Sequence, residues 1–164
     1  MNAMNLRVLF FLLCALALVP DAGAEPVHLK ALVIDQAYAR ATAPGQEVGV
    51  VYLTIENTGK TAEHLLSAAS PAARIVTLHS TRMSGGMSSM HHQAAFDIPA
   101  GGKLELQPSG LHLMLEGLKA PLVEGQEIVV RLTFGQSGTV DVPVPVRGMG
   151  AGPDMGSMHH DRMR

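Results

Sequence analysis

Cysteine is nearly absent from this sequence. Its single cysteine, Cys14, lies in the hydrophobic segment that opens the 164-residue chain. A chain cleaved after that segment would have no thiol and no disulfide, so its stability would have to come from a hydrophobic core. This composition also excludes sites that need a thiolate, such as cysteine nucleophiles and blue-copper electron-transfer centres.

Charged residues are scarce as well. Asp, Glu, Lys and Arg make up 16% of the chain, and the formal net charge is −2 with histidine neutral. The sequence lacks the excess of positive charge with which proteins neutralise nucleic-acid phosphates, so we expect no nucleic-acid partner. No catalytic triad stands out among the scattered Ser, His and Asp residues, and we expect the protein not to be an enzyme.

Long hydrophobic runs are missing except at the N-terminus. There Arg7 precedes the apolar stretch Leu9–Val19, which Pro20 ends. This run has the length of the hydrophobic region of an export signal. It is shorter than the roughly 20 apolar residues that a membrane-spanning helix needs. We therefore predict export to the periplasm; an uncleaved membrane anchor is the alternative.

The predicted cleavage site follows Ala24, where Ala-Gly-Ala fits the small-residue pattern of signal peptidase substrates. Residues 1–24 would form the signal peptide, and the mature protein would begin at Glu25 with no membrane contact. Lipidation of Cys14 is disfavoured because the bulky Leu13 stands where a small residue is required.

Short strand-like segments separated by turn residues fill the remaining sequence. They are rich in β-branched and aromatic residues or alternate between apolar and polar residues. The expected strands are Leu32–Arg40, Val48–Glu56, Leu65–Ala69, Arg74–Ser80, His91–Ile98, Lys103–Gln107, Leu111–Leu115, Ile128–Phe134 and Thr139–Val146. Their regular spacing predicts one all-β domain over residues 25–147, an antiparallel β-sandwich or barrel. Pro143 and Pro145 predict that the last strand lies at a sheet edge, or that their missing donors would face solvent.

Two metal-binding side chains share one face of the strand expected at Leu111–Leu115. Because alternate side chains of a strand point to the same side, His112 and Met114 lie together opposite the leucines. Imidazole and thioether ligands side by side select copper, above all Cu(I). Calcium and magnesium prefer oxygen ligands, and protein zinc sites rarely use methionine. His79 and Met90, at the two ends of a polar segment expected to be a loop, would complete a set of two His and two Met.

The polar segment Leu78–His92 holds further candidates. Met83, Met87, His91 and His92 are potential secondary ligands, with incidental residues of a solvated loop as the alternative.

The spacing of His79, Met90, His112 and Met114 resembles the signature of the periplasmic PCuAC copper chaperones, H-x10-M-x21-H-x-M. The flanking segments YLTIENTG, ARIVTLHSTRM and PAGGKLELQPSGLHLML are similar to that family too, and the likeness covers about residues 32–146. The resemblance implies a cupredoxin-like β-sandwich that binds Cu(I) at its rim through these four residues.

The resemblance also implies a function and a partner. Such a chaperone delivers copper for assembly of the CuA centre of cytochrome oxidase, so the acceptor would be cytochrome oxidase subunit II or another assembly factor. The alternatives are a periplasmic copper-buffering or resistance protein, a metal-free interaction module and, remotely, a copper enzyme. A copper enzyme of the monooxygenase type would use an N-terminal histidine, whereas His28 lies inside the predicted mature chain.

The composition changes after Val146 to a Gly-rich segment with methionine and histidine, which predicts a flexible tail over residues 148–164. We interpret the tail as a site of additional copper capture, of Cu(II) through its imidazoles; a solubilising extension is the alternative. The candidate tail ligands are Met149, Met155, Met158, His159, His160 and Met163.

Overall fold

The computed structural model describes residues 25–152, and these residues form strands and turns without a helix. The strands are β1 (Val27–Leu29), β2 (Leu32–Arg40), β3 (Val48–Asn57), β4 (Glu63–Ala69), β5 (Ala73–Ser84), β6 (Met87–His92), β7 (Phe96–Ile98), β8 (Lys103–Leu106), β9 (Leu111–Leu118), β10 (Glu127–Phe134) and β11 (Gly138–Arg147). Over this range no helix of sufficient length and apolarity to cross a membrane is present. The predicted signal peptide and most of the predicted tail lie outside the described residues.

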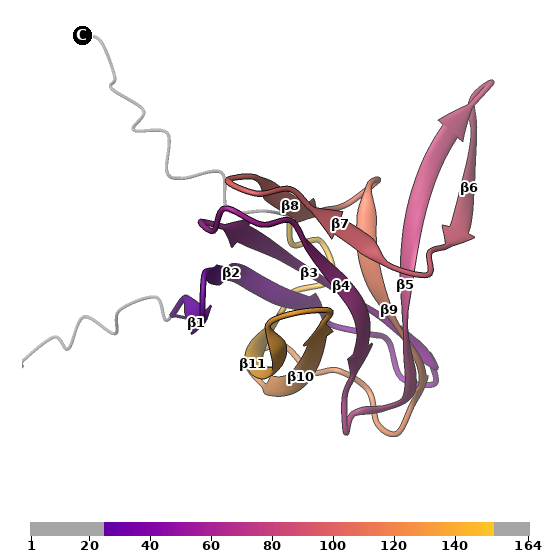
Figure 1. Cartoon of the computed structure of the whole chain (residues 1–164). Coiled ribbons are helices and arrows are strands. Elements are labelled where there is room, and N and C mark those ends of the chain that lie inside the picture. Colours follow the sequence, from indigo (N-terminus) through magenta and orange to yellow (C-terminus); the bar gives the residue numbers. More distant parts are fainter. Residues whose placement is uncertain (1–24, 153–164) are drawn as a thin grey trace, which may run out of the picture.

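The strands form one continuous sheet that folds over into a β-sandwich (Figure 1). Its strand order is β6-β5-β9-β8-β3-β2-β11-β10-β4-β7, with β1 added to β2. A short pairing of β4 with β5, at Ala68 and Val76, joins the two layers. Most neighbours are antiparallel, whereas β11–β2 and β8–β9 are parallel. The predicted all-β sandwich is therefore confirmed.

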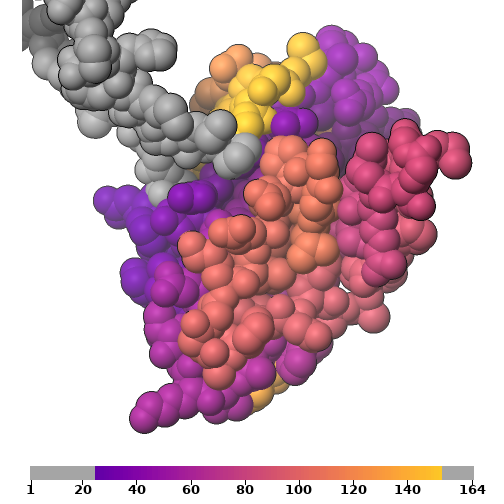
Figure 2. All heavy atoms as spheres, turned by 90° about the horizontal axis from the view of Figure 1, so that it is seen from above, coloured from indigo at the N-terminus to yellow at the C-terminus, as the bar shows by residue number. Residues whose placement is uncertain are grey.

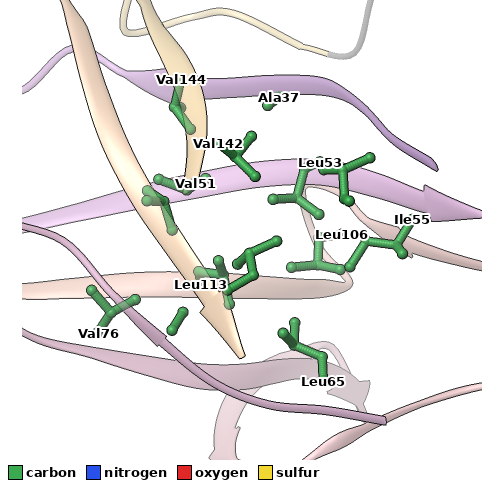
Figure 3. Packing of buried hydrophobic residues seen from close by; sticks show 14 of the residues in the cluster. Ala37, Val51, Leu53, Ile55, Leu65, Val76, Leu106, Leu113, Val142 and Val144 are labelled. Carbon is green, nitrogen blue, oxygen red and sulfur yellow. The ribbon is translucent and has the colours of Figure 1, made fainter. Parts of the chain in front are cut away.

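One apolar core lies between the layers and fixes which way the site residues point (Figure 3). In β9, Leu113 and Leu115 are fully buried and pack in this core with residues such as Val51 and Val142. Burying each such side chain contributes about 1.5–3 kcal/mol. Because successive side chains of a strand alternate, this burial turns His112 and Met114 to the outer face of β9.

The polar segment after His79 is a β-hairpin, so the expectation of a loop there is wrong. Strand β5 continues to Ser84, β6 begins at Met87, and the two strands pair along the whole segment. Gly85 and Gly86 form the two-residue turn with φ angles of 58° and 80°. Two central residues with positive φ give a turn whose twist matches that of the flanking strands, and glycine adopts it without steric cost.

Two further expectations need correction. The segment His91–Ile98 is not one strand, because β6 ends at His92 and the separate strand β7 pairs with β4. Strand β11 is also not an edge strand, since it lies between β10 and β2. However, β2 pairs with β11 only at Val146 and Arg147, so the part that contains Pro143 and Pro145 has a ladder on one side only. Proline is tolerated there because no second ladder requires its missing N–H.

Candidate metal centre

Three neighbouring strands bring three histidines into line on the outer face of the sheet. Strand β5 lies between β6 and β9, and His79 pairs with His92 on one side and with His112 on the other. Residues directly opposite each other in neighbouring strands share a face. The ring centroids of His79 and His112 are 5.9 Å apart with the rings stacked, and those of His79 and His92 are 5.7 Å apart edge to face. We call His92, His79 and His112 the histidine row.

The two methionines of the predicted ligand set flank this row. Met114 follows His112 by two residues and pairs with Thr77, whereas Met90 precedes His92 by two residues and pairs with Thr81. Both therefore lie on the face of the histidine row, each diagonal to His79 but on opposite sides of β5. The structure thus brings His79, His112 and Met114 together on two adjacent strands. It places Met90 across β5, with 59% of its surface exposed.

His112 is the most enclosed of these side chains, with 5% of its surface exposed. Its Nδ1 lies 3.2 Å from the carbonyl oxygen of Gly110. When Nδ1 carries the hydrogen and donates it to this carbonyl, Nε2 keeps its lone pair for a metal ion. Metal-binding histidines in proteins are commonly oriented by such a hydrogen bond from the second ring nitrogen.

His79 has a buried ring nitrogen that no described residue satisfies. Its Nδ1 is buried and has no hydrogen-bond partner within residues 25–152. Leaving a buried polar atom unpaired costs about 1–3 kcal/mol. Burial lowers the pKa of His79 below its ordinary value, and the neighbouring His112 and His92 lower it further, against a smaller opposing effect of Glu116. The imidazole is therefore neutral at neutral pH, which is the form that binds a metal.

The pKa shift of His79 predicts that acid destabilises the metal-free protein. Because the folded state disfavours the charged ring, the unfolded chain takes up this proton first. The stability contributed by His79 is complete above about pH 6.5, the ordinary histidine pKa, and is lost as the pH falls through the lower folded-state pKa. Urea unfolding at a series of pH values should show a smaller loss for His79→Gln than for the wild type. An equal loss in both proteins would contradict the assignment.

Glu116 is the acidic residue that lies next to the candidate ligands on this face. Glu116 is two residues beyond Met114, and its Oε1 accepts a 2.7 Å hydrogen bond from the Thr77 hydroxyl. In the part of the chain that the structure describes, no three His, Asp or Glu side chains are arranged as a group that could hold a metal.

The remaining candidates divide between the two faces of the β5–β6 hairpin. Met83 pairs with Ser88 and lies on the face of the histidine row. Met87 and His91 pair with Ser84 and Ser80 on the opposite face. The hairpin forms one edge of the molecule, as the space-filling view shows in pink at the right (Figure 2).

The sequence analysis treated His91 and His92 alike, as potential secondary ligands. The Gly-Gly turn is the signal that distinguishes them, because it fixes which residues of the hairpin lie on each face.

Most of the tail candidates fall beyond the described residues. Met155, Met158, His159, His160 and Met163 are among them. Met149 is described, is 65% exposed, and lines a shallow pocket with Val48 and Val50 of β3.

Comparisons with known proteins place the chain in a family. Residues 32–146 match the family described as putative lipoprotein LpqE-like. The putative lipoprotein Lxx21020 of Leifsonia xyli subsp. xyli is 36% identical over 135 residues, which cover 82% of this chain and 80% of that protein.

Solved structures show the same fold. The solution structure of Cu(I)-DR1885 from Deinococcus radiodurans is similar, with a TM-score of 0.58 and 33% identity over 77% of this chain and 83% of that chain. The copper-bound PCuAC domain from PmoF2 has a TM-score of 0.66 and 18% identity over 76% of this chain and 98% of that domain, a likeness of fold. The chain belongs to the LpqE-like family of putative lipoproteins and has the fold of PCuAC domains.

Proposed function

We propose that this protein is an exported, non-enzymatic copper chaperone whose cargo is Cu(I). The observation that carries the proposal is the outer face of β5 and β9. There His79, with its unsatisfied buried nitrogen, lies beside His112 and diagonal to Met114. Thioether and neutral imidazole ligands together select Cu(I) over harder metal ions. The 33%-identical protein from Deinococcus radiodurans whose structure was solved with Cu(I) supports the same cargo here.

The proposed ligands are His79, His112, Met114 and Met90. The first three come from paired strands whose inner faces are held by the core, so their backbone positions are fixed. Met90 lies on the exposed strand β6, one diagonal step from His79. Diagonal neighbours in a sheet are about 7–8 Å apart, which is within reach of a long side chain. Met90 would therefore approach the copper ion from the solvent side.

This difference in exposure suggests how copper leaves the protein. Met90 is mostly exposed and His112 is buried, so an acceptor can reach the outer ligand first. Copper would then pass by ligand exchange, in which an acceptor ligand binds before the last donor ligand dissociates, and no free ion is released. The proposed acceptor is cytochrome oxidase subunit II, for its CuA centre, or another assembly factor.

Export is part of the proposal. Relatives described as putative lipoproteins support a protein that leaves the cytoplasm. For this chain we propose cleavage after Ala24 and a periplasmic location rather than lipidation of Cys14, because of the bulky Leu13.

Replacing Met114 with Ala tests the ligand set. We expect the Cu(I) affinity to fall by roughly 10–100-fold, the range seen when a metal site loses a supporting interaction. The fold should be spared because the Met114 side chain lies outside the core. Competition with a chromophoric Cu(I) chelator under reducing conditions measures the affinity, and circular dichroism checks the fold. An unchanged affinity in a folded variant would reject the assignment.

A further inference from the structure

The β5–β6 hairpin places a second His–Met pair beside His79. Strand β6 carries Met90 and His92, two residues apart on one face, just as β9 carries His112 and Met114. Both strands are antiparallel to β5, one on each side of it. His79 therefore has a His–Met pair on each flank, and only one member of the β6 pair, Met90, belongs to the ligand set proposed above.

The two histidines that flank His79 are at nearly equal distances from it. Their ring centroids are 5.7 Å and 5.9 Å from that of His79. Metal–nitrogen bonds of about 2.0–2.1 Å allow two ligand nitrogens to be up to about 4 Å apart. Rings with centroids this close can meet that condition by side-chain rotation. By geometry, His92 is as well placed as His112 to share a metal ion with His79.

The surroundings of His92 leave its ring available. No hydrogen bond from the described residues engages the His92 ring, and all of β6 is exposed. Its neighbour His91 differs, because it lies on the opposite face and its Nε2 is 3.0 Å from the hydroxyl of Ser89. His79, which both flanking strands face, itself carries a buried Nδ1 without a hydrogen-bond partner among residues 25–152.

We propose that His92 is a copper ligand and that it forms an outer Cu(I) position which shares His79 and Met90 with the inner position completed by His112 and Met114. This inference rests on the proposed function. Copper occupies one position at a time, and His79 and Met90 stay bonded while His92 takes the place of His112 and Met114. The ion remains Cu(I) throughout, so the step needs no electron donor. The outer position is where copper enters and leaves, because β6 is exposed and His112 is buried.

The test compares His92→Ala with His91→Ala, adjacent substitutions on opposite faces of one exposed strand. In the full protein purified after export, with His159 and His160 replaced by Ala in every sample, the rate at which a chromophoric chelator takes Cu(I) from the loaded protein is measured. We expect His92→Ala to slow this transfer by on the order of tenfold and His91→Ala to leave it unchanged. Long-range 1H–15N NMR should show that Cu(I) shifts the ring nitrogens of His92 in the otherwise unaltered chain.

Each other outcome overturns the inference. A wild-type transfer rate in His92→Ala, or an equal slowing in His91→Ala, would show that His92 is not a specific ligand. Unmoved His92 ring signals would also reject it, even if the transfer slows. Met114→Ala, measured by Cu(I) affinity, separates this failure from that of the proposed function. If Met114→Ala weakens Cu(I) binding while His92→Ala keeps the wild-type transfer rate, the chaperone proposal stands without the outer position, and if Met114→Ala keeps its affinity as well, both proposals fail.

Discussion

Replacing His79 with Ala should reduce Cu(I) affinity more than any other single substitution in this protein. His79 is the central member of the histidine row and, within the proposed ligand set, the residue that is paired with a histidine on each flank. Replacing any other proposed ligand removes a donor from β6 or from β9 alone, whereas replacing His79 removes the donor that lies beside both strands. We expect a fall of about 100-fold, the upper end of the range for damaged metal sites.

Chelator competition measures this loss, and His28→Ala is the control, since His28 is an exposed residue of β1 outside the site. The fold should remain, because replacing His79 removes a buried nitrogen that has no partner among residues 25–152 and leaves no polar atom newly unpaired. A melting temperature equal to or above that of the wild type, together with the lost affinity, is the expected combination. Retained affinity would contradict the central place given to His79.

Leu113→Ala should have the largest effect on stability among the residues near the site. Leu113 lies between His112 and Met114 in the sequence. Unlike Met114, its side chain points into the core and is fully buried. Truncating a buried leucine to alanine removes apolar contacts and leaves a cavity, which costs about 2–5 kcal/mol. Without a disulfide to limit the unfolded state, a loss of this size is a large share of the roughly 5–15 kcal/mol typical of a folded domain.

Urea unfolding of the metal-free protein measures the loss, and Leu66→Ala is the matched control. Leu66 lies on β4 with 46% of its surface exposed, so the same chemical change should cost little there. The comparison with Met114→Ala is also informative. Adjacent substitutions in one strand are expected to separate the two functions of that strand, stability at Leu113 and copper binding at Met114. Equal destabilisation by Leu113→Ala and Leu66→Ala would contradict the assigned core.

Much of the fold could be predicted from sequence because its strands carry strong local patterns. The strand expected at Leu32–Arg40 has the bounds of β2, and the strands expected at Ile128–Phe134 and Thr139–Val146 lie within β10 and β11. Strand β1 was not predicted, because its three residues carry too little pattern to stand out. The all-β class follows from the number and spacing of such segments rather than from any single one.

The candidate site could be predicted only in part. The alternation in Leu111–Leu115 correctly turned His112 and Met114 away from the core. The row with His79 and His92 depends on the register of three strands. Strand β5 meets β9 through a pairing of segments that are distant in sequence, and local patterns do not encode such a register. The β5–β6 hairpin was missed because every residue of β6 is exposed and its methionines do not alternate with polar residues, so the usual period-2 signal is absent. Its Gly-Gly pair was the one local clue.

The two-glycine turn at Gly85–Gly86 has a consequence for how this segment can vary in length. One residue added to the returning strand β6 between the turn and Ser89 would shift its pairing by one step and rotate every later side chain to the other side of the ribbon. Met90 and His92 would then be turned away from His79, and Ser89 and His91 would take their places. Changes by two residues would preserve the facing. Strand β6 can therefore gain residues only two at a time if Met90 and His92 are to lie on the same face as His79. The number of residues between the turn and these side chains is thus as important for the proposed copper site as the ligands themselves.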